Sequence, residues 1–334
     1  MAPLPSYAIV LSTYNGVPYL ADQIESIRAQ TAPEWRLYVR DDGSSDDTRE
    51  QIARFAARDP RIVVLSDDVG HLGAPSSFAT LLSHAYARGE AYIFLSDQDD
   101  VWLPNKAARM LAVATREETR VGAQVPLLVH SDLRVVSAGL ELVHPSFFRY
   151  QRIDPHADAQ PVRLLLRNAV TGCATLVNRA LLERALPFPR VAMHDWWLAQ
   201  CAALFGHIAL VDHAMVLYRQ HGTNVFGAKG VLGAVLQTLR TPASAARRFL
   251  IGLSQLRELR RRAAAAERRP PASLQRLLEE LHDVLAADGT TALQRLRAVM
   301  RAGAGPSGLA ARALLLAQIA LLPWLRARYG HAAE

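Results

Sequence analysis

The sequence predicts an α/β fold in which a mostly parallel sheet is flanked by helices and followed by a helical C-terminal appendage. Three observations support this: β-rich and helical segments alternate over the first 100 residues, polar motifs follow three of the β-rich segments, and the composition shifts to Ala, Leu and Arg after Gly230. Strictly alternating β and α segments build a parallel sheet covered by helices. Because ligands bind beyond the carboxyl ends of such strands, we expect the functional site where the polar motifs lie.

The elements are expected in a regular order along the chain. Short apolar runs predict strands, and apolar residues at helical spacing predict helices. Up to residue 100, the predicted strands are 7–11, 36–40, 62–65 and 92–95, and the predicted helices are 20–30, 46–58 and 76–88. From there to residue 230, the predicted strands are 127–130, 133–136, 171–177, 208–211 and 214–218, and the predicted helices are 179–185 and 194–205. Beyond it, the predicted helices are 231–241, 243–269, 273–287, 291–302 and 308–329.

The composition limits the class of protein. The chain has 334 residues, half of them hydrophobic, and we expect a sheet-bearing domain at 1–230 and a basic helical region at 231–334. Only two cysteines are present, far apart, so neither a disulfide scaffold nor a zinc site is indicated and a reducing compartment fits. The N-terminus lacks the pattern of a signal peptide, and no uncharged apolar stretch reaches the roughly 20 residues of a spanning helix. We therefore expect a cytoplasmic protein.

Positive charge is concentrated at the C-terminal end. The net charge is +7, but residues 231–334 contain 16 Arg and 7 acidic residues, whereas residues 1–230 are slightly acidic. Such asymmetry points to an anionic partner, either a membrane surface or nucleic acid. The run from Arg257 to Arg262 lacks interleaved aromatic residues, which argues against nucleic acid.

Three clustered carboxylates are the most informative feature of the chain. Asp97, Asp99 and Asp100 directly follow the buried strand predicted at 92–95. Carboxylates this close repel one another unless a positive charge neutralises them, and Mg²⁺ or Mn²⁺ takes such oxygen ligands together with substrate phosphates. We expect a metal site that grips a diphosphate. The alternative is a solvated acidic turn in which Asp100 or Asn105 caps a helix.

Polar residues after the first two strands suggest a nucleoside pocket. Residues 12–15 offer hydroxyl groups and Tyr14 as a stacking face, although Asn15 and the glycine after it also suit a plain turn. In the segment 41–46, the carboxylate of Asp42 could accept a hydrogen bond from the N3–H of uracil or thymine. The alternative is a turn followed by a helix cap.

Two further motifs carry candidate chemistry. Asp195 lies beside Trp196 and Trp197, whose bulk would desolvate its carboxylate and raise its pKa towards that of a general base. The tryptophans would offer an apolar platform for a sugar, or else Asp195 caps a helix and the tryptophans are core. His221, in a polar loop after a strand beside Arg219, would complete a metal shell or contact a diphosphate, or be structural.

Together these motifs resemble family 2 of the inverting glycosyltransferases, which have the Rossmann-like GT-A fold. The matching segments are 9–16 (Ile-Val-Leu-Ser-Thr-Tyr-Asn-Gly), 39–48 (Val-Arg-Asp-Asp-Gly-Ser-Ser-Asp-Asp-Thr) and 94–102 (Phe-Leu-Ser-Asp-Gln-Asp-Asp-Val-Trp). The Ser-Asp-Gln-Asp-Asp-Val-Trp form is similar to the bacterial rhamnosyltransferase branch. The similarity is strong over residues 7–110 and weaker up to about Asn224.

The resemblance implies roles for individual residues. Asp195 would be the catalytic base, although His194 replaces the glutamate that often precedes this base in the family. The implied nucleotide-sugar-binding residues are Ser12, Thr13, Tyr14, Asn15, Asp42, Asp97 and Lys106. The implied metal ligands are Asp97, Asp99 and His221, and the expected acceptor-binding residues are His194, Trp196 and Trp197.

The resemblance also implies a reaction. We expect a metal-dependent inverting transfer of a sugar, first of all L-rhamnose from dTDP-rhamnose, to a glycan or lipid-linked saccharide in bacterial surface polysaccharide synthesis, with Mg²⁺ or Mn²⁺ as the cofactor. A UDP-hexose or UDP-N-acetylhexosamine donor is the alternative within the family. Outside it, the alternatives are a metal-dependent phosphohydrolase and a non-catalytic sugar-nucleotide- or membrane-binding module.

The end of the chain suggests a surface contact. Arg312 and Pro323 argue against a spanning helix at 308–329, whereas Trp324, Tyr329 and the nearby arginines suit a helix in the membrane interface. The C-terminal helices would then hold the protein peripherally on the inner face of the cell membrane. The alternative is a helix docked on the protein itself or on the partner in a homodimer.

Overall fold

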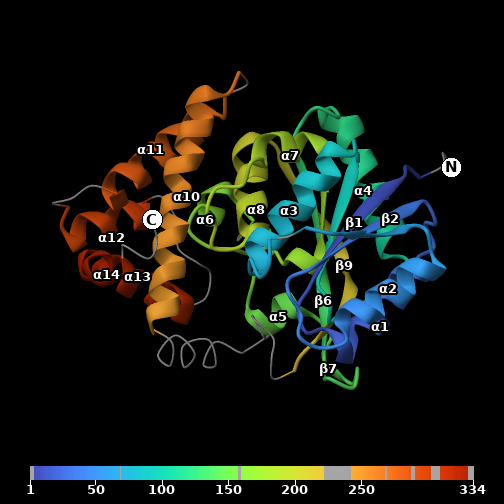
Figure 1. Ribbon diagram of the computed structural model, residues 1–334. Coiled ribbons are helices and arrows are strands. Elements are labelled where there is room, and N and C mark those ends of the chain that lie inside the picture. The colour runs from blue at the N-terminus through green and yellow to red at the C-terminus, as the bar shows by residue number, and fades with distance from the viewer. Residues whose placement is uncertain are drawn as a thin grey trace.

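The computed structural model describes residues 4–67, 69–156, 159–221, 242–267, 269–286, 290–301 and 309–329. Within these ranges the chain forms a nine-stranded sheet in the order β3-β2-β1-β4-β8-β6-β9-β5, and β7 pairs with β6 outside this path. Helices cover the sheet, and the C-terminal helices pack as a group at one side (Figure 1). The predicted α/β fold with a helical appendage is confirmed.

The strands are β1 (Tyr7–Thr13), β2 (Trp35–Asp41), β3 (Ile62–Leu65), β4 (Tyr92–Ser96), β5 (Val101–Trp102), β6 (Leu127–Val136), β7 (Leu142–His144), β8 (Thr175–Asn178) and β9 (His207–Arg219). The helices up to β9 are α1 (Val17–Arg28), α2 (Thr48–Arg58), α3 (Ala74–Ala87), α4 (Lys106–Val121), α5 (Phe147–Gln151), α6 (Pro161–Leu164), the 3₁₀ turn η1 (Gly172–Ala174), α7 (Arg179–Ala185) and α8 (His194–Phe205). The C-terminal helices are α10 (Pro242–Ala265), α11 (Ala272–Ala286), α12 (Ala292–Arg301), α13 (Leu309–Ala320) and α14 (Leu322–Tyr329).

The sheet is parallel in its first half and mixed in its second. β1 pairs in parallel with β2 and β4, and β2 with β3. β8 is antiparallel to both β4 and β6, so β6 and its parallel neighbour β9 point the same way as β4. The sheet is thus mostly parallel, as expected, and of the described strands only β5, β7 and β8 run in the opposite direction. The five longest strands, β1, β2, β4, β6 and β9, run in the same direction, so their carboxyl ends lie at the same end of the sheet.

Two pairs of short strands predicted from the sequence are single strands in the structure. β6 runs through both 127–130 and 133–136, and β9 runs through both 208–211 and 214–218. Their pairing continues past register shifts near Ser131 and Asp132. Polar residues in mid-strand resemble a turn in the sequence, but the partner strand holds them in the ladder.

A hydrophobic core lies on each face of the sheet. Neighbouring residues of β1 point to opposite faces, so Ile9 joins one core and Val10 the other. The core around Ile9 includes residues of α1 and α4. The core around Val10 includes α3 and α8 and continues into the C-terminal helices through Leu256 and Leu278.

Specific contacts hold the C-terminal helices against the sheet-bearing part of the chain, residues 4–221. Gln255 of α10 accepts a hydrogen bond from the backbone N–H of Ala192 (2.8 Å) and donates to Gln200 of α8 (2.7 Å). Arg262 donates to the carbonyl oxygens of Arg184 (2.6 Å), in the last turn of α7, and Leu186 (3.2 Å), just after it. These hydrogen bonds fix α10 against α8 and the end of α7.

The predicted C-terminal helices are found where the structure describes them. The predicted helix 231–241 and the predicted boundary at residue 230 lie outside the described residues. The predicted helix 308–329 is two helices, α13 and α14, with a break at Leu321. Pro323 causes such a break because its ring removes an N–H and crowds the carbonyl group four residues earlier. Among the described helices, none is both long enough and apolar enough to cross a membrane.

Candidate active site

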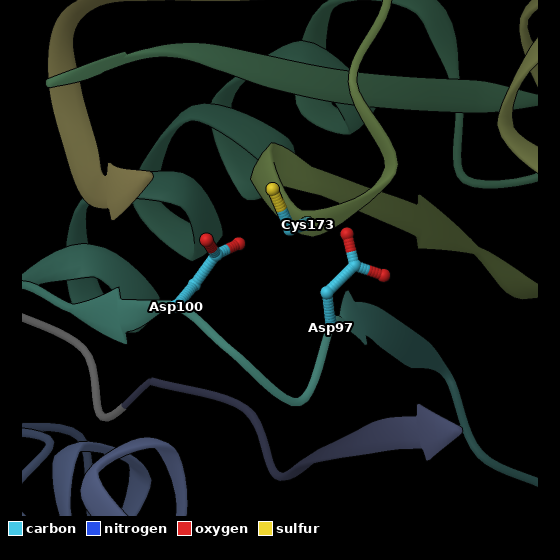
Figure 2. Close-up of side chains that lie close together, drawn as sticks. All are labelled: Asp97, Asp100 and Cys173. Carbon is cyan, nitrogen blue, oxygen red and sulfur yellow. The ribbon is translucent and has the colours of Figure 1, made fainter. Parts of the chain in front are cut away.

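The carboxylate cluster lies in the loop after β4 and is divided in an unexpected way. A carboxylate oxygen of Asp97, one of Asp100 and the Cys173 sulfur lie within 4.8 Å of one another, and Figure 2 shows both side chains reaching towards the sulfur. Asp99 instead contacts His221, with 2.8 Å between Oδ2 and Nε2. The sequence could not reveal this division, because Cys173 and His221 arrive from distant parts of the chain.

The cluster carries unfavourable negative charge. Burial raises the pKa of Asp97 to about 7, with further contributions from Asp99 and Asp195. Burial also raises the pKa of Asp100 well above its usual value, with Asp99 and Asp97 adding to the effect. A positive charge close to these carboxylates would stabilise their ionised forms and lower their pKa values.

Lys106 is buried next to the carboxylate cluster and does not reach the protein surface. Its side chain is fully buried, its Nζ donates to the Cys173 carbonyl oxygen (2.5 Å), and it lies 3.4 Å from the Trp102 ring centroid. Burial lowers its pKa to about 7, although Asp100 and Asp97 oppose this. Lys106 is thus enclosed by the protein next to the cluster, and its implied contact with a nucleotide sugar stays a prediction.

The donor atoms present fit a divalent cation. The Oδ2 atom of Asp100 is buried with no hydrogen-bond partner among the described residues, and a carboxylate oxygen of Asp99 and an imidazole nitrogen of His221 face each other. Carboxylate oxygens suit Mg²⁺ and Mn²⁺, and an imidazole ligand favours the transition metal. Asp99 and His221 would hold such an ion, with Asp97 and Asp100 close by.

Gln98, between the carboxylates, ties this loop to the loop after β1. Its Oε1 accepts hydrogen bonds from Thr13 Oγ1 (2.6 Å) and the Tyr14 N–H (2.8 Å), and its Nε2 donates to the Tyr14 carbonyl (3.1 Å). A Cβ added at Gly16 would lie 2.6 Å from the same Oε1, so the Gln98 amide could keep this position only next to glycine. Sequence reasoning missed Gln98, although its place between two candidate ligands was a signal.

The predicted nucleoside residues gather at the ends of β1 and β2. Ser12 Oγ donates to Ser77 Oγ (2.7 Å), and Asn15 Oδ1 accepts from the Ser45 N–H (2.8 Å). Asn15 has a φ of 49°, a left-handed conformation that asparagine tolerates. The exposed Tyr14 ring packs against His71, with 4.6 Å between ring centroids. Of this group, Tyr14 offers the open aromatic face that was expected.

The Asp42 side chain, the expected acceptor for a base, forms hydrogen bonds within the protein. It is buried, and its Oδ1 accepts hydrogen bonds from Arg40 (2.5 Å) and the Leu72 N–H (2.8 Å). Its Oδ2 accepts from the Gly73 N–H (2.8 Å), and the Nδ1 atom of His71 lies 3.0 Å away. The hydrogen bond of His71 Nδ1 goes to the Asp42 backbone carbonyl oxygen (2.9 Å), so the carboxylate itself accepts three hydrogen bonds from the described residues. These contacts hold the Asp42 side chain against the loop that ends at Gly73, and its contact with a base stays a prediction.

Asp195 lies in the first turn of α8 within a set of N–H donors. Its Oδ1 accepts from Asn168 Nδ2 (3.0 Å) and the Trp196 N–H (2.7 Å), and its Oδ2 accepts from the Gly172 N–H (3.0 Å). A Cβ added at Gly172 would lie 2.9 Å from His194 Nε2 and 3.5 Å from Asp195 Oδ2, so glycine permits the close approach. Burial raises the pKa of Asp195 to about 6, and the donors oppose this rise. Such a carboxyl group can exchange a proton near neutral pH.

The expected acceptor platform is mostly part of the protein interior. His194 is 3% exposed and stacks on Phe78 with ring centroids 3.9 Å apart, and Trp197 is completely buried. Trp196 is partly buried, and its ring lies against Gly252 of α10. His194 and Trp197 therefore pack the helix that carries Asp195, and their buried rings leave no face for an acceptor.

Arg219, at the end of β9, forms hydrogen bonds that hold the loop with Asp99 and Asp100 in place. Its Nε donates to the Asp99 carbonyl (2.9 Å), one terminal nitrogen donates to the Ala138 carbonyl (2.6 Å), and the other donates to Asp22 (2.8 Å). Its backbone N–H donates to Asp100 Oδ1 (3.1 Å). Because arginine can form several hydrogen bonds in a fixed plane, this one residue fixes the carboxylate loop, the turn after β6 and α1.

Comparisons with known proteins agree with this architecture. Two curated relatives are the UDP-Glc:alpha-D-GlcNAc-diphosphoundecaprenol beta-1,3-glucosyltransferase WfgD of Escherichia coli (27% identical over 191 residues, 57% of this chain and 67% of WfgD) and the dTDP-rhamnosyl transferase RfbG of Shigella flexneri (25% over 228 residues, 65% of this chain and 74% of RfbG). The chain thus spans about two thirds to three quarters of their length.

Solved structures show the same fold. S. aureus TarS 1–349 in complex with UDP-GlcNAc has a TM-score of 0.55 at 15% identity, covering 98% of this chain and 89% of that one. The Pyrobaculum calidifontis mannosyltransferase PcManGT in complex with GDP-Man and Mn²⁺ also has a TM-score of 0.55, at 18% identity, covering 98% and 84%. Residues 8–185, more than half of the chain, match the family model "Glycosyl transferase family 2". This match, together with the clustered carboxylates and the fold, shows that the chain belongs to glycosyl transferase family 2.

Proposed function

We propose that this glycosyltransferase uses a nucleotide-diphosphate sugar and a divalent cation, and transfers the sugar with inversion at the anomeric carbon. The observation that carries the proposal is the position of Asp195, a buried carboxylate with a pKa of about 6 that interacts electrostatically with Asp97. A general base whose pKa is close to neutral pH thus lies beside the carboxylates that would bind a metal ion and, through it, a diphosphate.

The chemistry requires one displacement. Asp195 takes the proton of an acceptor hydroxyl group, whose oxygen attacks the anomeric carbon from the face opposite the leaving diphosphate. Among the described residues, Oδ2 accepts from the Gly172 N–H and Oδ1 from both Asn168 and Trp196, so we assign the proton to the less occupied Oδ2 atom. A cation held by Asp99 and His221 would stabilise charge on the leaving group.

The donor is best proposed from the relatives. One relative is named as a dTDP-rhamnosyl transferase, which supports L-rhamnose from dTDP-rhamnose as the first candidate. Another is named for UDP-glucose and a diphosphoundecaprenol-linked acceptor, which supports a UDP-hexose as the alternative donor and a lipid-linked saccharide as an acceptor. At 25–27% identity both donors deserve equal testing.

The helical region is proposed as a contact with the inner face of a membrane. Leu321 and Trp324 are more than half exposed, and Arg328 follows on the same helical stretch. Large apolar side chains beside arginines favour an interfacial position. We retain the cytoplasmic location and the division into 1–230 and 231–334 as parts of this proposal, and a homodimer through the same helices is the competing assignment.

Thermal shift with a panel of nucleotide sugars tests the donor proposal. A ligand that binds the native state raises the melting temperature, so dTDP-rhamnose or a UDP-sugar should raise it, and more so with Mn²⁺ present. Asp99→Asn should remove the Mn²⁺-dependent part of the shift, whereas Asp212→Asn, which removes an exposed carboxylate outside the cluster, serves as the matched control. If no nucleotide or nucleotide sugar raises the melting temperature with or without Mn²⁺, the proposed function is wrong.

A further inference from the structure

The side chain of Gln98 continues the pairing between two strands beyond the point where the strands stop pairing. β1 and β4 are parallel neighbours, and their last registered pair is Leu11 with Ser96. Past this pair, Gln98 Oε1 accepts from the Tyr14 N–H (2.8 Å), and Gln98 Nε2 donates to the Tyr14 carbonyl oxygen (3.1 Å). A primary amide offers a donor and an acceptor as a peptide group does, so this side chain takes the place of a neighbouring strand.

The surroundings of the amide fix its orientation and its length. Thr13 Oγ1 also donates to Gln98 Oε1 (2.6 Å). Exchanging the amide oxygen and nitrogen would set the amide donors against the Tyr14 N–H and its oxygen against the Tyr14 carbonyl, so the observed orientation is the one that bonds. A Cβ added at Gly16 would lie 2.6 Å from Oε1 and 2.7 Å from Thr13 Oγ1, so glycine leaves the room that the amide occupies.

The link joins two parts of the site that differ in chemistry. The first, which we call the nucleoside half-site, is the exposed ring of Tyr14 packed against His71 with 4.6 Å between ring centroids. The second, the metal half-site, includes Asp97 and Asp99, which precede and follow Gln98 in the chain. A nucleotide-diphosphate sugar would contact both half-sites at once, so the distance between them must match one ligand.

The nucleoside half-site is held from two directions. Asn15 Oδ1 accepts from the Ser45 N–H (2.8 Å), and the Asn15 N–H donates to Ser44 Oγ (2.9 Å). Asn15 thus attaches the loop after β1 to the loop after β2, whereas Gln98 attaches it to the loop after β4. Of these two attachments, the one formed by Gln98 reaches the metal half-site.

We infer that Gln98 is a positioning residue that sets the spacing between the nucleoside half-site and the metal half-site, and thereby the affinity for a ligand that spans both. The inference deepens the proposed function, on which it rests. Two binding groups joined in one molecule gain affinity from each other only when their link matches the separation of their sites. A ligand that occupies one half-site alone does not depend on this spacing.

Binding of three kinds of probe to the full chain tests the spacing. Uridine or thymidine occupies the nucleoside half-site alone, Mn²⁺ occupies the metal half-site alone, and UDP or dTDP with Mn²⁺ spans both. Gln98→Met removes the three hydrogen bonds and keeps a side chain of similar length. It should weaken binding of UDP or dTDP with Mn²⁺ about tenfold or more, and change binding of the nucleoside or of Mn²⁺ alone less than about twofold.

Calorimetry measures the nucleosides and nucleotides, and the electron paramagnetic resonance signal of free Mn²⁺ measures the ion. Gln124→Met is the matched control, since Gln124 is exposed in the turn between α4 and β6, and it should bind every probe like the wild type. Equal losses for the single-site and the spanning probes in Gln98→Met would make Gln98 a general support of the fold. Unchanged binding of the spanning probe would show that the loops keep their spacing without it. Either result overturns the inference.

Thr13→Val changes the same link from the side of β1. Valine resembles threonine in shape but cannot donate to Gln98 Oε1, so this variant should weaken the spanning probe several-fold and spare the nucleoside alone. The double variant T13V/Q98M should lose no more affinity than Gln98→Met, because both changes act on one link. Losses that add would mean that the two side chains act independently and would reject the link. If Gln98→Met does not fold, equal weakening of the nucleoside and the spanning probe by Thr13→Val rejects it instead.

The wild type separates this inference from the proposed function. If it binds neither UDP nor dTDP in the presence of Mn²⁺, the proposed function fails and the inference falls with it. If it binds one of them and Gln98→Met binds that ligand equally well, the inference alone fails and the proposed function stands.

Discussion

Individual hydrogen bonds to the Asp195 carboxylate influence its pKa and its orientation. Burial raises its pKa, whereas Asn168, Gly172 and Trp196 donate to the charged form and oppose that rise. Asn168 is itself oriented by the Val170 N–H, which donates to its Oδ1 atom (3.0 Å). Asn168 is therefore a positioning residue for the proposed base.

Loss of the Asn168 amide should change both rate and pH dependence. Asn168→Ala should lower kcat about tenfold to a hundredfold and leave the donor KM nearly unchanged, because the base loses its orientation but donor contacts remain. The pKa seen in the acidic limb of the kcat profile should also rise, since a donor to the carboxylate is gone. An acidic limb at the wild-type pH, with a normal melting temperature, would contradict the positioning role.

The wild-type enzyme should lose activity in mild acid. The proposed base works only as a carboxylate, and its pKa is about 6, so kcat should be constant above pH 7 and fall as the pH drops through about 6. An unperturbed aspartate would remain ionised down to about pH 4. A steady-state rate that stays level from pH 7 to pH 5 would exclude Asp195 with this pKa as the base.

At the scale of elements, Arg219 joins segments that belong to different parts of the chain. It fixes the loop after β4, the turn after β6 and α1 through Asp99, Ala138 and Asp22. Lysine could preserve the charge but not three directed hydrogen bonds, because its ammonium group is a compact point charge.

Arg219→Lys should therefore weaken the metal side of the site. We expect several-fold weaker binding of Mn²⁺ in the presence of the donor and a lower melting temperature, because buried carbonyl groups lose their donors. Arg116→Lys is the matched control, since Arg116 is exposed and forms only a surface ion pair with Glu117. Equal effects of the two substitutions would show that Arg219 is not a special brace.

At the scale of the whole molecule, one hydrophobic core joins the sheet to the helical appendage. Val10 of β1 and Leu259 of α10 belong to the same cluster of buried residues, and Gln255 hydrogen-bonds to the helix that carries Asp195. The helical region should therefore unfold together with the catalytic half, although its composition differs.

Truncation of a buried leucine in α10 should destabilise the entire chain. Leu259 is fully buried, so Leu259→Ala should cost about 2–5 kcal/mol and shift a single unfolding transition, monitored both by circular dichroism and by loss of donor binding. Leu293→Ala, at a position that is 55% exposed, should have little effect. Two separate transitions, with donor binding lost only in the unshifted one, would mean that the appendage is an independent domain.

The sequence by itself determined the local structure of the protein and the place of its polar motifs. The apolar spacing predicted β1 to β4 and the helices between them, because side-chain periodicity is set by backbone geometry within one element. Polar motifs directly after strands predicted where the site lies, since parallel strands end at a common edge. The Asp-x-Asp spacing predicted a cluster of carboxylates at this edge.

Only the tertiary structure decided which groups meet within the site. Asp99 contacts His221, 122 residues away, and Asp195 takes donors from segments more than 20 residues distant. Only the tertiary structure shows that Asp42, Lys106, His194 and Trp197, which the sequence predicted as ligand contacts, are buried. Such pairings depend on how separate elements pack, and the spacing of residues along one segment carries no record of that packing.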